Sequence, residues 1–132
     1  MSKQRHRKQN RKYRDFSWFV ALFLCSVPVI LWAAPQGQLE TPAPGSAQSG
    51  IGLIRGWVCS ANQVEVEVEG RGKLVAAYGQ PRGDTQAACG DSNNGFSAQV
   101  NWNDLGDGNY TVRALADEVE FGRATFSVVT LG

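Results

Sequence analysis

Histidine is almost absent from this chain of 132 residues, and methionine and cysteine are scarce. The one histidine is His6, in a basic segment near the N-terminal end, and the three cysteines are Cys25, Cys59 and Cys89. Ser-His-Asp and Cys-His catalysis need an imidazole beside the nucleophile, and tetrahedral zinc sites draw on histidine and clustered cysteine. Because residues 7–132 contain no histidine, the composition disfavours an enzyme, and we expect no catalytic residue, metal or cofactor.

Charge is missing from the nineteen residues between Phe16 and Ala34, FSWFVALFLCSVPVILWAA. Residues 1–15 before them carry seven Lys or Arg against one Asp. A basic segment, an apolar run and then small residues are typical of a secretory signal or a signal anchor, with the basic side in the cytoplasm. The run is also about long enough to cross a hydrocarbon core of ~30 Å as a helix. We therefore expect residues 35–132 to be exported across a bacterial inner membrane.

The fate of this apolar run has two interpretations. Cleavage after Ala33 or Ala34 yields a periplasmic or secreted protein, whereas retention leaves an inner-membrane anchor in contact with lipid. Pro28 within the run favours cleavage, and Pro35 directly after the small residues disfavours it. A lipoprotein anchor at Cys25 is not expected, because bulky side chains precede this cysteine. A nucleic-acid partner for the basic segment is not expected either, because the apolar run follows it directly.

The remainder of the chain divides into a linker and a strand-rich domain. Residues 35–50, PQGQLETPAPGSAQSG, have too little apolar content to fold and predict a linker. Short apolar or alternating segments then follow, bounded by Gly, Asn and Asp, and QVEVEVE over 63–69 alternates strictly. The expected strands cover residues 51–59, 63–69, 73–78, 95–102, 109–116, 119–121 and 123–131. About seven such strands predict an antiparallel, immunoglobulin-like β-sandwich over residues 51–132.

The stretch LGDGNYTV over residues 105–112 adds a local feature. A Gly two residues before a Tyr that opens a strand is typical of the tyrosine corner of β-sandwiches. We therefore expect the Tyr110 hydroxyl to hydrogen-bond the backbone near residues 105–106. Val112 stands where an antibody domain has its second cysteine, so a true antibody-type domain is not predicted.

The motifs GIGLIRGWVC, VEVEVEG, AAYGQPRGD, GF, LGDG and TVRALAD are spread over residues 50–132. Together they resemble the small immunoglobulin-like β-sandwich domain of bacterial exported proteins, an uncharacterised family. The resemblance implies export and a binding or accessory role, and it implies no activity.

Cys59 and Cys89 form an even pair in a domain that we expect to be exported. A disulfide is the simplest use of such a pair in an oxidising compartment. It would close about 30 residues and stabilise the fold by roughly 3–4 kcal/mol. A metal or nucleophile role is the alternative, but no histidine lies near either cysteine in the sequence.

The alternating strand raises the question of paired carboxylates. Glu65, Glu67 and Glu69 share one strand face, opposite the valines between them. Paired carboxylates serve in glycoside hydrolysis. Three like charges along one strand are more often a solvated face, which Arg71 or Arg113 would neutralise across strands.

The segment 79–95, GQPRGDTQAACGDSNNG, is a long stretch without a strand pattern, and such loops often carry function. Its candidate calcium ligands are Asp84, Asp91, Asn93 and Asn94. Their spacing fits no EF-hand or RTX loop, and Asx turns explain the same residues. Arg82 and Asp84 also belong to an Arg-Gly-Asp triplet of the kind that integrins bind, for which a salt bridge or a turn is the simpler interpretation.

Trp57 and Trp102 are the tryptophans of the predicted domain. On a solvent-facing sheet they could stack on sugar rings, and packing in the core or over the disulfide is the alternative. We therefore expect a non-catalytic interaction module that binds an unidentified protein or glycan of the bacterial envelope. The alternative is a carbohydrate- or calcium-dependent binding domain that uses Trp57, Trp102 and the 79–95 loop.

Overall fold

The computed structural model describes residues 28–131. The apolar helix predicted over residues 16–34 lies mostly outside this range, and residues 28–36 have no regular secondary structure. Within the described range, none of the helices has the length and apolar character needed to span a membrane.

The regular structure of the described chain is mostly β-strand, with short helical segments in two connections. The strands are β1 (Gly37–Thr41), β2 (Ala47–Gln48), β3 (Ile51–Val58), β4 (Val64–Val68), β5 (Lys73–Val75), β6 (Ala77–Gln80), β7 (Gly95–Asn101), β8 (Gly108–Ala116) and β9 (Val119–Val128). The helical segments are the 3-10 helices η1 (Gly83–Thr85) and η2 (Trp102–Asp104) and the short helix α1 (Gln86–Cys89). The prediction of an all-β fold is confirmed.

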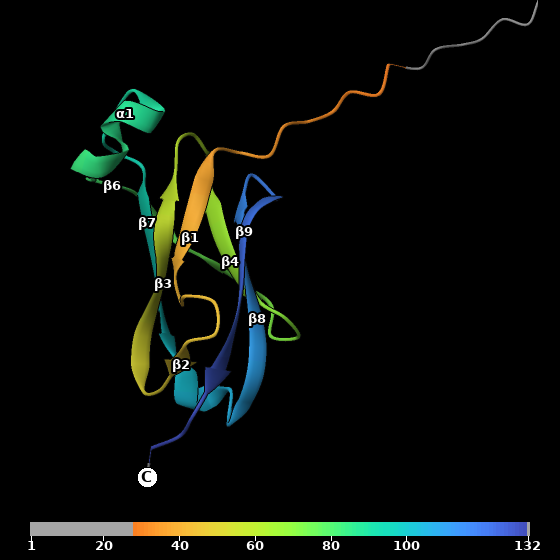
Figure 1. Cartoon of the computed structure of the whole chain (residues 1–132), viewed down its shortest axis with the longest axis vertical. Helices are drawn as coiled ribbons and strands as arrows, with labels where there is room; N and C mark the ends of the chain where they lie inside the picture. Colours follow the sequence, from red (N-terminus) through yellow and green to blue (C-terminus); the bar gives the residue numbers. More distant parts are fainter. Residues whose placement is uncertain (1–27, 132) are drawn as a thin grey trace, which may run out of the picture. The chain divides into compact units, whose positions relative to one another are not determined.

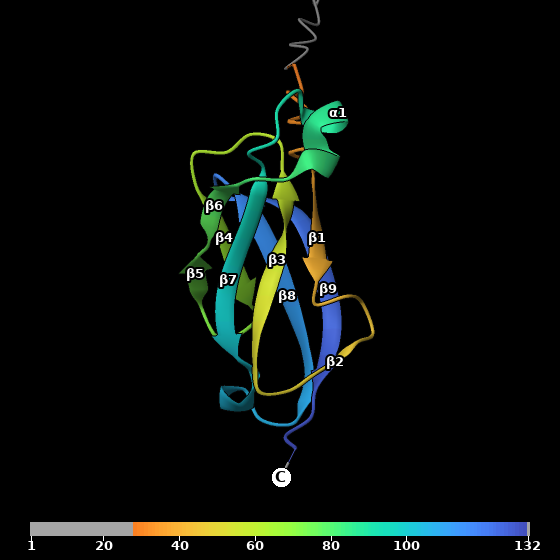
Figure 2. The same cartoon turned by 90° about the vertical axis from the view of Figure 1, so that its left-hand side faces the viewer.

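The strands form two sheets that face each other. One sheet has four strands in the order β1-β3-β7-β6, and the other has five in the order β2-β9-β8-β4-β5. Every pairing is antiparallel except that of β2 with β9. Figure 1 shows the two layers side by side, and Figure 2 views the four-stranded sheet face on, with β8 and β9 behind it. The two sheets form a β-sandwich.

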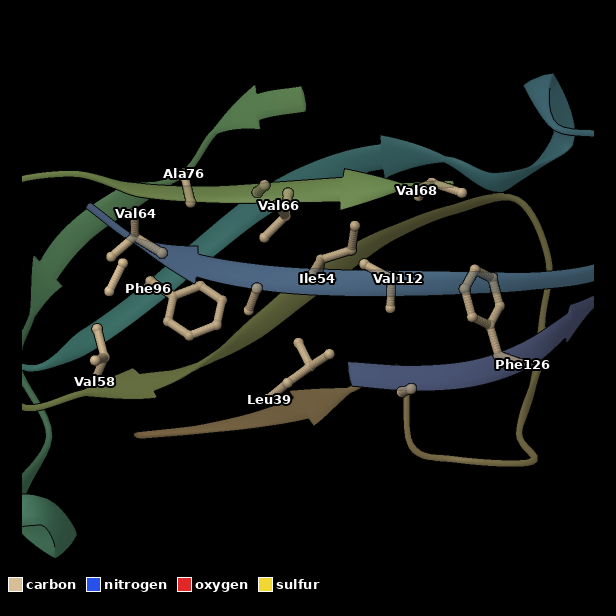
Figure 3. Close-up of a cluster of buried hydrophobic side chains, with 14 of the residues drawn as sticks. Leu39, Ile54, Val58, Val64, Val66, Val68, Ala76, Phe96, Val112 and Phe126 are labelled. Atoms are coloured by element: carbon tan, nitrogen blue, oxygen red, sulfur yellow. The ribbon is translucent and has the colours of Figure 1, made fainter. Parts of the chain in front are cut away.

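The core lies between the sheets and explains the alternating strand. In β4 the valines at 64, 66 and 68 are buried, whereas the glutamates between them are only partly buried. This alternation arises because the pleat of a strand directs successive side chains to opposite faces. Figure 3 shows Val64 and Val66 facing Ile54 and Phe96 of the other sheet, with Val112 on the neighbouring strand β8. The predicted orientation of the VEVEVE segment is confirmed.

The prediction of a linker over residues 35–50 is wrong. Residues 37–41 form β1, which pairs with β3, and residues 47–48 form β2, which pairs with β9. Leu39 and Pro42 are buried, and a Cβ atom on Gly122 would lie 2.7 Å from the Leu39 Cβ atom. The segment folds despite its polar composition because its sheet partners satisfy its backbone and one leucine and one proline reach the core.

Two predicted strand boundaries also need correction. The strand expected over residues 73–78 is two strands in different sheets, and the chain crosses between the sheets at the buried Ala76. The strands expected over 119–121 and 123–131 are one continuous strand, β9. Gly122 does not interrupt β9, because it stays paired with Ala114 and lacks the side chain that would collide with β1.

The predicted tyrosine corner is confirmed. The Tyr110 hydroxyl donates to the carbonyl oxygens of Leu105 and Gly106, the latter at 3.0 Å. These bonds fasten the turn before β8 to the strand itself. Val112, two residues further on, is fully buried in the core.

Candidate functional site

The disulfide predicted between Cys59 and Cys89 is present, with Cα atoms 4.9 Å apart. Cys59 directly follows β3, and Cys89 is the last residue of α1. The bond therefore fastens the helical connection between β6 and β7 to the end of β3. This end of the sandwich carries α1 in Figures 1 and 2.

A buried asparagine holds the same connection from the inside. Asn94 is only 1% exposed, and its Oδ1 atom accepts a hydrogen bond of 2.7 Å from the Thr85 hydroxyl. Its Nδ2 atom donates to the Cys59 carbonyl at 3.1 Å and to Asp91 Oδ1 at 2.6 Å. The backbone carbonyl of Asn94 also accepts from the Val58 N–H at 3.0 Å. The connection is thus rigidly placed against β3.

The candidate calcium ligands are used by the fold itself. Asp91 Oδ1 accepts from the Asn93 backbone N–H at 3.3 Å, which is the Asx turn that was the alternative interpretation, and it also accepts from Asn94. Asp84 pairs with Arg82. Among residues 28–131, no group of three or more His, Cys, Asp or Glu is placed to hold a metal ion. Asn93 itself is exposed.

The Arg-Gly-Asp triplet forms a structural ion-pair cluster. The Arg82 guanidinium donates two bonds to Glu40, at 2.7 and 3.0 Å, and two to Asp84, at 2.9 and 2.5 Å. Hydrogen bonds from Arg82 lower the pKa of the Asp84 carboxyl, and the two carboxylates raise the pKa of Arg82. The salt-bridge interpretation of this triplet is confirmed, and Arg82 joins the 81–94 connection to β1.

This ion pair makes a testable prediction about acid titration. The pKa of Asp84 is below its ordinary value, so the pair with Arg82 persists in acid and is lost only as the pH falls through that lowered pKa. We expect Arg82→Gln to raise the pKa of Asp84 toward its ordinary value, as measured by NMR titration of the side-chain carboxyl carbon. The low pKa of Asp107, which depends on a hydrogen bond from Thr130, is the internal control and should not move. An unchanged Asp84 titration in the variant would contradict this account.

The two candidate tryptophans occupy opposite environments. Trp102 is 1% exposed and packs edge-on against Phe126 in the core, with ring centroids 5.0 Å apart. The prediction of a sugar-stacking role for Trp102 is therefore wrong, and the core interpretation is confirmed. Trp57 is half-buried, and its neighbours across the sheet are Gln38 on β1 and Gly95 on β7. Because Gly95 has no side chain, no side chain of β7 projects from the sheet directly beside Trp57.

A shallow polar hollow of about 250 Å³ lies over the same part of the four-stranded sheet. Its lining residues are Glu40, Arg55, Gly56, Gln80, Pro81, Arg82, Gly95 and Phe96. A side chain at Gly95 would enter the hollow, because a Cβ atom there would lie 3.0 Å from the Gln80 carbonyl oxygen and 3.2 Å from the Arg82 Cδ atom. Gly56 faces inward, and a Cβ atom there would meet the Gln38 carbonyl oxygen of β1 at 2.0 Å. The hollow combines guanidinium, carboxylate and amide groups with a stretch of β7 that carries no side chain at Gly95.

The outer face of the five-stranded sheet has a different character. Its charged side chains pair with each other in a lattice across β4, β5, β8 and β9. Arg113 binds Glu67 at 2.5 Å, and Arg123 reaches Glu69 at 3.4 Å. The glutamates of β4 are therefore neutralised as expected, with Arg113 as one partner. Arg71 is not a partner, because its guanidinium donates to the Leu105 carbonyl at 3.1 Å.

The sequence did not mark Glu40, Arg55 or Gln80 as residues of a binding site. Glu40 belongs to the segment that was predicted as a linker. Arg55 and Gln80 lie within the motifs GIGLIRGWVC and AAYGQPRGD, but neither was a candidate binding residue. The available signal was the alternation within GQLET. Leu39 points into the core, and Gln38 and Glu40 on either side of it belong to the opposite face of the strand. Arg55 forms no ion pair with any residue in the described range.

Comparison of the chain with protein-family models, with curated proteins and with solved structures finds no match.

Proposed function

We propose that this chain is an exported, non-catalytic, immunoglobulin-like binding module of the bacterial envelope. Its binding surface is the outer face of the four-stranded sheet, here called the Trp57 face and defined by Glu40, Arg55, Trp57, Gln80 and Arg82. One observation carries this assignment. The charges on the five-stranded sheet neutralise each other, whereas the Trp57 face offers an aromatic ring beside a polar hollow.

The strand order supports the immunoglobulin-like assignment. The order β1-β3-β7-β6 follows the A-B-E-D sheet of such domains, and β9-β8-β4 follows the G-F-C sheet. Tyr110 has the corresponding position, near the start of β8, the strand that plays the part of F. A buried valine replaces the cysteine of antibody domains in that strand, and the disulfide of this chain lies elsewhere.

Two features support export. The basic segment, the apolar run and the small residues have the order of a signal or signal anchor, and the disulfide needs an oxidising compartment to persist. The described residues include the last part of the apolar run. There, the side chains from Val29 to Trp32 are 71–88% exposed. In a membrane anchor, lipid would cover such side chains.

The rigidity of the Trp57 face favours recognition. The disulfide, Asn94 and the bidentate pair of Arg82 with Glu40 hold the 81–94 connection beside the hollow. A surface that is already ordered loses less conformational entropy on binding than a flexible loop does. An aromatic ring together with an arginine is also the composition that dominates binding energy in many interfaces.

A glycan is a second candidate ligand, because Trp57 lies near the hollow in the same sheet. An indole ring packs against the apolar face of a sugar, and the guanidinium, carboxylate and amide groups of the hollow offer donors and acceptors to hydroxyl groups. This candidate uses Trp57 without Trp102 and without calcium.

Site-specific cross-linking in the producing bacterium tests the proposed function. A photo-reactive amino acid at Gln80 on the Trp57 face should give a defined adduct, and the same amino acid at the exposed Thr125 on the other sheet should not. Trp57→Ala should reduce that adduct about tenfold or more, because a central aromatic residue usually dominates binding. The matched control Thr125→Ala should leave the adduct unchanged.

The outcomes separate the two candidate ligands. A protein adduct lost in Trp57→Ala supports a protein partner, and Trp57-dependent binding of the purified chain to isolated peptidoglycan or to a glycan array supports a glycan. Equal adducts from Gln80 and Thr125, together with the absence of any Trp57-dependent glycan binding, would overturn the assignment.

A further inference from the structure

Among residues 28–131, Arg55 is the one charged residue of the four-stranded sheet without a counter-ion. The four strands of this sheet contain two charged residues, Glu40 and Arg55. Glu40 accepts two hydrogen bonds from Arg82, whereas Arg55 forms no ion pair within the described range. In the five-stranded sheet, each Lys or Arg of a strand has a carboxylate partner. The free charge of Arg55 is therefore an exception in this domain.

Arg55 lies next to Trp57 on the outer face of β3. The residues at 54, 56 and 58 are buried, so Arg55 and Trp57 share the opposite face, and their backbone positions are about 7 Å apart along the strand. Arg55 lines the polar hollow, and so does Gly95, the partner of Trp57 on β7. Figure 2 shows β3 between β1 and β7 in this sheet. An aromatic ring and a free guanidinium thus lie next to each other at the hollow.

Uncharged polar side chains surround this pair. Gln38 on β1 is opposite Trp57, and Ser97 on β7 is opposite Arg55. The Gln80 Nε2 atom donates to the Ser97 hydroxyl at 2.8 Å. Amide and hydroxyl groups can both donate and accept hydrogen bonds. They therefore suit the hydroxyl groups of a sugar, which also do both.

The charge at the hollow matches a ligand with a single negative charge. Arg82 offers no free charge there, because Glu40 and Asp84 bind its guanidinium. The planar guanidinium of Arg55 can donate two parallel hydrogen bonds to a carboxylate. A phosphate monoester carries about −1.5 to −2 charges, and Glu40 in the same hollow would repel the excess. A carboxylate is therefore the better match.

We propose that the ligand of the Trp57 face is a glycan whose sugar units carry a carboxylate, such as a uronic acid. The sugar ring packs against Trp57, and its carboxylate binds Arg55. One uronic acid supplies both contacts, because its carboxylate is attached at the edge of the ring. The acidic ligand rests on the proposed function in its glycan form, to which it adds the charge of the sugar. Leu53 and Ile51, further along β3, are 43% and 72% exposed and stay uncovered by this ligand, whereas a protein partner would cover them.

Binding of the full chain, in detergent, to immobilised glycans tests the acidic ligand. The probes are oligogalacturonate, oligomannuronate and hyaluronate, each beside the same glycan with its carboxylates reduced to hydroxymethyl groups. At least one acidic glycan should bind about tenfold more tightly than its reduced partner, because reduction removes a charge-assisted pair. Added salt should weaken this preference. Arg55→Gln should abolish it and leave the binding of the reduced glycan unchanged.

Two control variants make the result specific to the site. Arg71→Gln removes another cation that forms no ion pair within residues 28–131, and it should keep the preference for the acidic glycan. Leu53→Ala, on the same face of β3, should leave the affinity for both forms unchanged. Trp57→Ala should weaken both forms about tenfold or more, because both pack a sugar ring against the indole.

The outcomes separate the acidic ligand from the proposed function. Absence of binding to every glycan, equal binding of each acidic glycan and its reduced partner, or a preference that Arg71→Gln removes as fully as Arg55→Gln would overturn the acidic ligand. A Trp57-dependent adduct at Gln80, or Trp57-dependent binding of the reduced glycans, would still support the proposed function in those cases. A protein adduct at Gln80 that depends on Leu53 and is unaffected by Arg55→Gln would assign the face to a protein and would also overturn the acidic ligand.

Discussion

Replacement of both Cys59 and Cys89 by serine is expected to lower the free energy of unfolding by about 3–4 kcal/mol. The bond joins residues 30 positions apart, and its removal releases the conformational freedom of that loop in the unfolded chain. The described domain comprises about 100 residues, so its stability is a small difference between large opposing contributions. Loss of the disulfide should therefore remove a large part of the total free energy of unfolding.

Urea unfolding followed by tryptophan fluorescence measures this loss. The wild-type chain in reductant should behave like the double serine variant, whereas reductant should not change the variant. The loss should also loosen the 81–94 connection, which hydrogen exchange of the backbone N–H groups around Asn94 would detect. Equal stability of oxidised and reduced protein would show that the bond does not constrain the unfolded chain as proposed.

Trp102→Ala is expected to destabilise the fold by about 3–5 kcal/mol, which is the usual cost of deleting a large buried aromatic side chain. Trp102 is 1% exposed and packs against Phe126, so its removal leaves a cavity between the sheets. Trp102→Phe should cost much less, about 1–2 kcal/mol, because it keeps an aromatic ring and removes the indole N–H that has no hydrogen-bond partner.

Trp57→Ala provides the contrast within the same protein. Trp57 is half-buried on an outer face, so its removal opens no enclosed cavity, and we expect a loss of about 1–2 kcal/mol at most. Urea unfolding of the three variants, each with an unchanged disulfide, measures the difference. Comparable losses for Trp57→Ala and Trp102→Ala would contradict the assignment of one tryptophan to the surface and the other to the core.

The two tryptophans also show how far the sequence could predict this site. Trp102 follows Phe96 and Ala98 at even spacing, so its inward direction was available from the period of two in residues 95–102. Trp57 lies in a segment that is apolar on both faces, with Leu53 on its own face and Ile54 on the other. Periodicity cannot orient such a strand, and only the opposing sheet decided which face is buried.

The segment before residue 51 shows a second limit. Its proline, glycine and serine content is that of a linker, yet β1 and β2 add to opposite sheets and Leu39 packs against β9 at Gly122. Composition reports how much apolar surface a segment can bury by itself. It does not report that a neighbouring sheet supplies hydrogen bonds for its backbone and a glycine at the point of closest approach.

Local chemistry determined the alternating strand, the tyrosine corner and the cysteine pair from the sequence alone. Each of these depends on a short period, on a turn of few residues or on the small number of possible partners, so neighbouring residues contain the necessary information. Tertiary structure alone decided which sheet each half of residues 73–78 joins, which tryptophan faces solvent and how Glu40, Arg55 and Gln80 meet in one hollow. These features arise from contacts between distant strands, whose register is set by the packing of the whole sandwich.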